Sequence, residues 1–311
     1  MVAWRTPTRL GCACTRAWPR EAACRSCAPA LSSRPVSGLW DESLYAGSAE
    51  FYAIGRLPYP PRLATELGVR LGLTGHGRLL DLGCGPGSLT LLLAPLFADV
   101  MAVDADADML RVGQGRSAQL LGVENVTWVH CRDESLPDDL APLDVTTLAQ
   151  SFHWMDQPLV AEKIRRLLVP GGCCVHVGAT THEGVVGAVG LPRPAPAREG
   201  ITELVRGYLG PHRRAGKAVI TQELSSNEDL VFRSAGYEGP ERVEVVAGDI
   251  VIRTEDEVIA SVLSLSSSAS HLFGPRLPKF AADLRSLLRA VSPDGVFAEQ
   301  QRDITLSLWR A

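Results

Sequence analysis

The chain has 311 residues, of which 46% are hydrophobic and 21% are charged. This is the composition of an ordinary globular protein rather than of a disordered or fibrous one. A chain of this length can bury a large core without a disulfide or a metal ion. No apolar run approaches the ~20 residues that a membrane span needs, and the net charge of −4 provides no cationic field for nucleic acid.

Residues 1–40 differ in composition from the remainder. They hold six arginines, one glutamate, and the cysteines Cys12, Cys14, Cys24 and Cys27, with no apolar periodicity. We therefore expect a disordered basic extension. Zinc binding by the cysteines, a transit peptide and a wrongly assigned start codon are the alternatives, whereas a secretory signal would need an apolar stretch. Without this segment, 25 basic and 34 acidic residues remain, a net charge of −9.

From Gly38 onward, strand-like and helix-like segments alternate, which predicts an α/β fold with a parallel sheet. The expected strands are residues 78–82, 100–103, 126–130, 145–149 and 173–177, and the expected helices are 88–97, 106–121 and 159–168. A turn at Pro170-Gly171-Gly172 is expected to separate the last helix from the last strand.

Beyond Gly178 the alternation is looser. The Pro-rich stretch 190–200 reads as a linker or loop. We then expect helices at 201–209, 255–265 and 277–291, and strands at 243–246 and 304–309. The basic cluster His212, Arg213, Arg214 and Lys217 is either a solvated surface or a site that selects an acidic substrate.

The stretch LLDLGCGPGS, from Leu79 to Ser88, runs from a strand into a glycine-rich turn that opens a helix. Glycines allow positive φ and let a ligand approach the backbone, which predicts a nucleotide cofactor at the carboxyl ends of the strands. A dinucleotide fingerprint would need glycine at position 88. Asp81, two residues before Gly83, could instead hold a cationic group such as the ammonium of S-adenosylmethionine (SAM).

The second strand ends at Asp104, 21 residues after Gly83. A carboxylate at this place can accept both hydroxyls of a ribose. NAD would use the same acid, and an acid at a helix N-terminus is also favoured by the helix dipole. Asp104 therefore indicates a nucleoside without choosing between the two cofactors.

The segments LLDLGCGPGSL, VMAVDADADML, CRDESLP, AQSFHWMD and LLVPGGCCVHV resemble, in order and spacing, the class I SAM-dependent methyltransferases. FYAIGRLPYP and FHWMD are similar to the small-molecule branch of type 11 and trans-aconitate methyltransferase-like enzymes. The resemblance covers nearly all of the chain after residue 40. It implies one domain over 41–311: a Rossmann-like, doubly wound, mostly parallel seven-stranded sheet with helices on both faces, an N-terminal lid and an inserted helical cap.

The resemblance also implies a SAM site at the ends of the strands. Asp81 and the loop glycines would line the methionine and ribose side, and Met109 would pack either in the core or on the adenine. The family usually has a small residue where this chain has Asp133, so either Asp133 or Glu134 would meet the adenine amino group. The expected cofactor-binding residues are Asp81, Gly83, Cys84, Gly85, Gly87, Asp104, Ala105, Met109, Asp133, Glu134 and Gln150.

Methyl transfer from SAM is an in-line displacement, so the protein's task is mainly positioning. An alcohol, phenol or amine acceptor needs a general base, whereas a carboxylate does not. His153, which follows the fourth strand, is the candidate group near the methyl, the alternative being a structural role. Tyr52 and Arg56 lie on the lid, residues 41–60. Arg56 either pairs with a carboxylate of SAM or of an anionic substrate, or is a solvated surface arginine.

The sequence therefore predicts a cytoplasmic SAM-dependent methyltransferase, acting as a monomer or homodimer, that methylates a small molecule at a carboxylate or hydroxyl oxygen. Neither nucleic acid, a membrane nor a metal ion is expected to take part. The alternatives are an NAD(P)-dependent oxidoreductase, against which Ser88 argues, and a non-catalytic protein that binds SAM or another protein.

Overall fold

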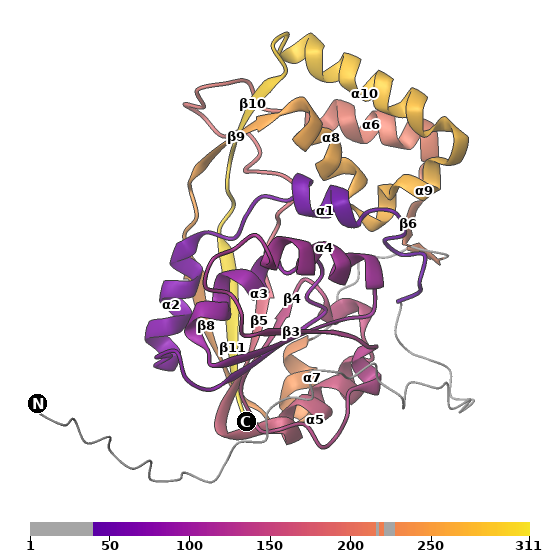
Figure 1. Cartoon of the computed structure of the whole chain (residues 1–311). Helices are drawn as coiled ribbons and strands as arrows, with labels where there is room; N and C mark the ends of the chain where they lie inside the picture. Colours follow the sequence, from indigo (N-terminus) through magenta and orange to yellow (C-terminus); the bar gives the residue numbers. More distant parts are fainter. Residues whose placement is uncertain (1–39, 216–217, 221–227) are drawn as a thin grey trace, which may run out of the picture.

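The computed structural model describes residues 40–215, 218–220 and 228–311 (Figure 1). Residues 1–39 of the expected basic extension, with its four cysteines, lie outside the described residues. So do Lys217 and the side chains of Arg213 and Arg214 from the basic cluster.

A seven-stranded sheet occupies the lower half of Figure 1, in the order β3-β2-β1-β4-β5-β11-β8. The first five strands in this order pair in parallel, and β11 runs antiparallel to both β5 and β8. The expected mostly parallel sheet is therefore confirmed. The bounds are β1 Arg78–Leu82, β2 Asp99–Asp104, β3 Val126–His130, β4 Leu143–Ala149, β5 Leu168–Gly178, β8 Glu238–Val245 and β11 Ile304–Arg310.

Helices cover both faces of this sheet. Successive side chains of a strand point to opposite faces, so Leu79 and Leu80 of β1 enter two different cores. Leu79 packs with residues of α2 and α3, and Leu80 packs with residues of α5 and α7. Buried on both faces, the strands are rich in Leu and Val, as parallel strands are. The helices are α2 Pro61–Leu71, α3 Ser88–Leu93, α4 Ala107–Ser117, α5 Gln157–Leu167 and α7 Glu228–Ser234.

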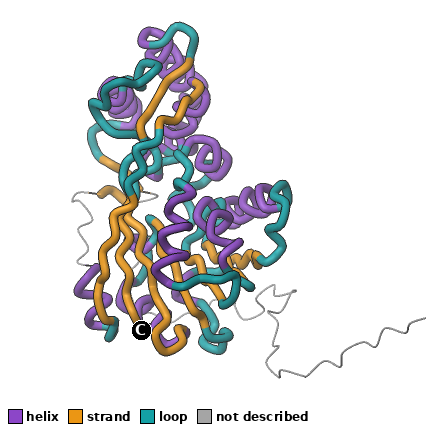
Figure 2. The backbone as a smooth tube through the Cα atoms, turned by 90° about the vertical axis from the view of Figure 1, so that its left-hand side faces the viewer, coloured by secondary structure: helices purple, strands orange, loops and turns teal. Residues whose placement is uncertain are grey.

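A second group of elements, here called the cap, lies above the carboxyl ends of the parallel strands (Figures 1 and 2). It has a hydrophobic core of its own, in which Phe273 and Phe280 stack. Helix α1, Ala49–Gly55, lies beneath the cap and above α4 (Figure 1). The expected lid and cap are thus present. The cap consists of α6 Arg198–Leu209, β9 Ile250–Thr254, α8 Glu255–Leu263, α9 Ser270–Phe273, α10 Leu277–Val291 and β10 Val296–Gln300.

Some expected boundaries were wrong. Pro170-Gly171-Gly172 does not precede the fifth strand but forms an irregularity inside it, where the register shifts between Leu143 and Val145 of β4. The helix expected at 88–97 ends at Leu93 and tightens into a 3₁₀ turn over Ala94–Leu96, because Pro95 has no N–H to donate. The helix expected at 106–121 ends at Ser117.

Several elements were not expected from the sequence at all, among them α1, α2, α7, β9 and β10. Short elements such as the seven-residue α1 are held by tertiary contacts rather than by local propensity. Within the described part of the chain, no helix is both long enough and apolar enough to cross a membrane.

Candidate cofactor-binding site

The turn after β1 exposes backbone to an open cleft. Gly83, Gly85 and Gly87 all have positive φ, between 54° and 74°. A Cβ placed on Gly85 would meet no atom within 4 Å, whereas a Cβ on Gly87 would lie 2.4 Å from the indole of Trp128. Gly85 therefore faces free space, and Gly87 is required for packing under Trp128.

Asp104 ends β2 directly opposite this turn. Its Oδ2 accepts a hydrogen bond from Gly85 N at 2.7 Å, and its Oδ1 accepts one from Asp106 N at 2.8 Å. Burial raises the pKa of Asp104 to about 6 despite these two bonds. Each carboxylate oxygen keeps a further lone pair, so Asp104 can still accept two hydroxyl donors.

The cleft lies at the carboxyl ends of β1, β2 and β4, and its two halves share Tyr52, Gly83, Gly85 and Ala149. The first half is lined also by Trp40, Tyr45, Asp104, Ala105, Met109, Asp133, Gln150, Ser151, Trp154 and Met155. The second half is lined also by Arg56, Leu57, Tyr59, Asp81, Cys84, Pro86, Ser88, Leu89 and Thr181. Both halves thus combine residues of the strand ends with residues of the lid.

Asp81 lies at the base of the second half and is only 1% exposed. Its two oxygens accept hydrogen bonds from Thr90 Oγ1 at 2.5 Å and from Thr147 Oγ1 at 2.7 Å. Burial raises the pKa of this carboxyl group. Since the two hydroxyls leave part of its accepting capacity unused, Asp81 can also receive a donor from the cleft.

Asp133 and Glu134, adjacent in a 3₁₀ turn, point in different directions. Asp133 lines the cleft, and its buried Oδ1 has no hydrogen-bond partner within the described structure. Burial, and then the charge of Asp104, raise its pKa well above the usual value. Glu134 instead accepts from Arg132 Nε and from Asp156 N, and it does not line the cleft. The structure thus brings Asp133 to the site and leaves Glu134 outside it.

The lid closes the cleft from above. The guanidinium of Arg56 lies over the ring of Tyr52, 4.3 Å from its centroid. It donates to Ser264 Oγ at 2.8 Å, to Ser264 O at 3.0 Å and to Thr181 Oγ1 at 3.4 Å. All three acceptors are neutral, so within the described residues the charge of Arg56 has no carboxylate in contact. A half-buried arginine of this kind is suited to an anionic ligand.

Gln150, the residue after β4, is the one described residue other than glycine with positive φ, 56°. Its Nε2 donates to Tyr59 Oη at 3.1 Å, which fixes the amide against the lid. Left-handed backbone at a non-glycine residue costs about 1 kcal/mol or more and is concentrated at functional sites.

Two other expected site residues do not line the cleft. His153 lies in a short 3₁₀ turn with its ring 4.6 Å from that of Trp154, and Trp154, not His153, faces the cleft. Gly87 supports the loop from behind, as described above. The remaining expected residues, from Tyr52 to Gln150, line one half or the other.

Sequence reasoning missed several residues that line the cleft. Tyr45 and Trp40 precede the first helix of the lid, and Thr181 follows β5. The aromatic character of Trp40, directly before the lid, and of Tyr45, inside it and ahead of α1, was an available signal for these two. Nothing in the local sequence distinguishes Thr181.

Known proteins resemble the central part of this chain. Residues 79–172 match a family described as a methyltransferase domain. An uncharacterized methyltransferase of Mycobacterium tuberculosis is 35% identical over 133 residues, 42% of this chain and 51% of that protein. A ubiquinone biosynthesis O-methyltransferase of Xanthomonas oryzae is 35% identical over 108 residues, 33% of this chain and 43% of that protein. The chain thus spans about half the length of the curated relatives it matches.

Among solved structures, the YcgJ protein of Bacillus subtilis superposes with a TM-score of 0.45 and 17% sequence identity, over 79% of this chain and 97% of that one.

Proposed function

We propose that this protein, whose residues 79–172 match a family described as a methyltransferase domain, is a class I SAM-dependent methyltransferase that transfers a methyl group from SAM to a carboxylate or hydroxyl oxygen of a small molecule. The observation that carries the proposal is that two acidic residues, Asp104 and Asp133, line the same half of the cleft as Gly85. Asp104 has unused acceptor capacity, and Asp133 has a buried oxygen without a hydrogen-bond partner among the described residues.

These acceptors fit the donors of a nucleoside. We assign the ribose hydroxyls to Asp104, which stands at the end of the strand next to the glycine turn. We assign the adenine amino group to Asp133, because a buried, unpartnered acceptor is costly until a donor meets it. Ala105 and Met109, which line the same half, would pack against the base.

The second half of the cleft fits the amino acid part of SAM. Asp81 would receive the ammonium group beside Cys84 and the loop backbone. Arg56 would pair with a carboxylate, a group that both SAM and an acid acceptor carry. Tyr52 lies between the two halves and would cover the cofactor from the lid, while Gln150 would hold Tyr59 in place.

When bound, SAM would supply a methyl group on a sulfonium, and an acceptor oxygen would bond to that methyl carbon in line as the carbon–sulfur bond breaks. The protein's part is to orient the two reactants and to exclude water, and the lid and cap provide the cover. No histidine lines the cleft among the described residues, and a carboxylate acceptor would need no general base. The name of the Xanthomonas relative, an O-methyltransferase, supports an oxygen acceptor.

We place His153 outside the chemistry and propose that it holds Trp154 against the cleft. For Gly87 we propose a structural role, and for Glu134 a role in fixing the turn that carries Asp133. Further proposals are that residues 41–311 act as one domain, that the protein is cytoplasmic, and that it works as a monomer or homodimer on a small molecule rather than on nucleic acid or a membrane.

Calorimetric titration with SAM and with NADH tests the cofactor. We expect SAM to bind and NADH not to bind at millimolar concentration, and the reverse result would favour an oxidoreductase. Transfer of labelled methyl from SAM to a panel of carboxylates, phenols and amines tests the reaction. Binding of SAM with no transfer to any acceptor would favour a protein that binds SAM without catalysis.

A further inference from the structure

Two adjoining cavities run beneath α6 in the cap. The outer cavity has a volume of about 650 Å³ and the inner cavity about 260 Å³. Arg198, Thr202 and Arg206 line both, so the two cavities adjoin along one helix and are together called the α6 groove. These three positions are four residues apart and share one face of α6, so the α6 groove extends along that face.

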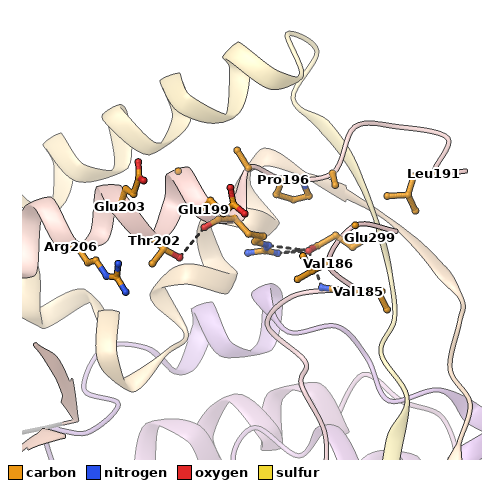
Figure 3. A pocket seen from close by; sticks show the side chains of 15 residues that line it. Val185, Val186, Leu191, Pro196, Glu199, Thr202, Glu203, Arg206 and Glu299 are labelled. Carbon is orange, nitrogen blue, oxygen red and sulfur yellow. Dashed lines mark hydrogen bonds and ion pairs between the residues drawn. The ribbon is translucent and has the colours of Figure 1, made fainter. Parts of the chain in front are cut away.

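The walls of the α6 groove are partly apolar and partly polar. The loop before α6 contributes Val185, Val186 and Pro196 to the outer cavity, where Thr202 and Arg206 face it from the helix (Figure 3). The inner cavity has a polar part, which includes His182, His212 and Ser261. Its aliphatic part comes from α6, α8 and the turn that follows α8, and consists of Ile201, Val205, Leu209, Val262 and Leu265. An aliphatic wall along a groove of this length fits an elongated molecule with an apolar body.

The inner end of the α6 groove adjoins the cofactor cleft at two points of the chain. Thr181 lines the cleft and the next residue, His182, lines the groove. Ser264 binds Arg56 and the next residue, Leu265, lines the groove. The guanidinium of Arg56, bonded to both Thr181 and Ser264, therefore stands at the boundary between the cleft and the groove.

Positive charge predominates at this inner end. Arg198 donates to His182 O at 3.2 Å and Arg302 donates to Gly184 O at 2.8 Å, in addition to Arg56. Glu199 and Glu203 line only the outer cavity, and the carboxylates nearest the inner end are already paired. Glu299 binds Arg198 and the buried Arg253, and Glu183 binds Arg302.

Burial and these charges lower the pKa of the His182 imidazole. Burial, and then the charges of Arg56, Arg198 and Arg302, lower the pKa of His182 to about 3, against a small opposing effect of Glu299. A second cation at this place is therefore disfavoured, and His182 is too weak a base to take a proton from an alcohol or an amine.

Given the function proposed above, on which this inference rests, we infer that the α6 groove binds the methyl acceptor and that the acceptor is a carboxylic acid with an elongated apolar body. The carboxylate enters first, toward Arg56 and the cofactor cleft, and the apolar body lies along α6. The charge of Arg56 favours a carboxylate over a primary amine with the same body, and a carboxylate, unlike an alcohol, needs no base.

The resulting reaction needs no proton transfer. One carboxylate oxygen forms a bond to the methyl carbon while the carbon–sulfur bond breaks and its electron pair stays on sulfur. A carboxylate and a sulfonium thus give a methyl ester and a neutral thioether, and charge balances without an acid or a base.

Three probes that share one chain test the inference: octanoate, 1-octanol and octylamine. Their binding is measured by ligand-detected NMR on the full chain, saturated with S-adenosylhomocysteine. We expect octanoate to bind at least tenfold more tightly than octylamine, and 1-octanol to lie between. Equal or tighter binding of octylamine would overturn the inference.

The variant Thr202→Trp fills the α6 groove from an exposed helix position. We expect it to lose octanoate binding while its Kd for SAM changes less than twofold. Ala282→Trp, on the exposed face of α10, is the matched control and should bind octanoate as the parent does. Retained octanoate binding in Thr202→Trp would overturn the groove as the site, whereas failure of the unsubstituted protein to bind SAM would instead overturn the proposed function.

Discussion

Asp104 Oδ2 accepts the backbone N–H of Gly85 at 2.7 Å, so the acid at the end of β2 and the glycine turn after β1 form one rigid unit. The bond aligns the carboxylate with the open space in front of Gly85. It also means that the conformation of the turn and the ligand-binding capacity of Asp104 depend on each other.

Asp104→Ala should weaken SAM binding by about 1–3 kcal/mol, because the ribose hydroxyls lose a charged acceptor. Calorimetric titration measures the change in Kd. A Kd that does not move would show that Asp104 serves only to hold the turn.

SAM affinity should also depend on pH through Asp104. Its pKa is about 6 in the free protein, and hydroxyl donors prefer the ionised form. Affinity should therefore be level above pH 6 and fall about tenfold for each unit below it, since the carboxyl must release a proton to bind. Titrations from pH 5 to 8 check this. Asp104→Asn has no proton to release, so its affinity for SAM should not fall below pH 6 in this way.

Asp133→Ala should act in opposite directions on stability and on binding. Without ligand, the variant should be more stable by about 1 kcal/mol, because a buried acceptor without a partner is removed. Its affinity for SAM should fall at least tenfold, because the adenine amino group loses its acceptor. Urea unfolding and calorimetry measure the two effects, and a loss of stability would contradict our reading of Asp133.

Gly85→Ala and Gly87→Ala form a matched pair, since both residues have positive φ. Gly87→Ala should destabilise the fold by more than the ~1–2 kcal/mol of the backbone conformation, because its Cβ would meet Trp128. Gly85→Ala should carry only the backbone cost but should weaken SAM binding, since its methyl would occupy the cleft. Thermal unfolding and SAM titration distinguish them, and equal effects of the two on both measurements would argue against the geometry of the loop.

His153→Ala should lower kcat by less than threefold, because Trp154 and not His153 faces the cleft. If His153 were the general base, its removal would lower kcat by about 10²–10⁴ and would change the pH profile of kcat. Steady-state kinetics over a range of pH decides between the two.

The strands of the sheet, and the glycine turn with Asp104, could be predicted from the sequence because these features are local. Asp104 follows a buried strand at a fixed distance from Gly83, and such a pattern is visible in one dimension. Asp133 and Glu134 could not be separated in this way. They are neighbours in one turn, and what turns Glu134 aside is Asp156, 22 residues away.

The same limit applies to the cap. Its buried ion pairs join Glu299 to Arg198, 101 residues earlier, and to Arg253, and no local pattern announces them. The pairing of a charged strand residue with a distant helix is decided by the tertiary fold alone. His153 is the converse case, since its place after β4 predicted a role near the methyl group, whereas it does not line the cleft.

Hydrogen bonds attach α1 to the cap, and this attachment affects how the protein can evolve a preference for a new acceptor. Arg253 donates to Gly55 O at the end of α1, and Ser48 Oγ donates to Leu263 O of α8. The helix that carries Tyr52 of the cleft is thereby anchored to the elements that surround the α6 groove. A substitution in the cap that alters acceptor preference will also be felt in cofactor affinity, so selection for a new acceptor must act on both properties together.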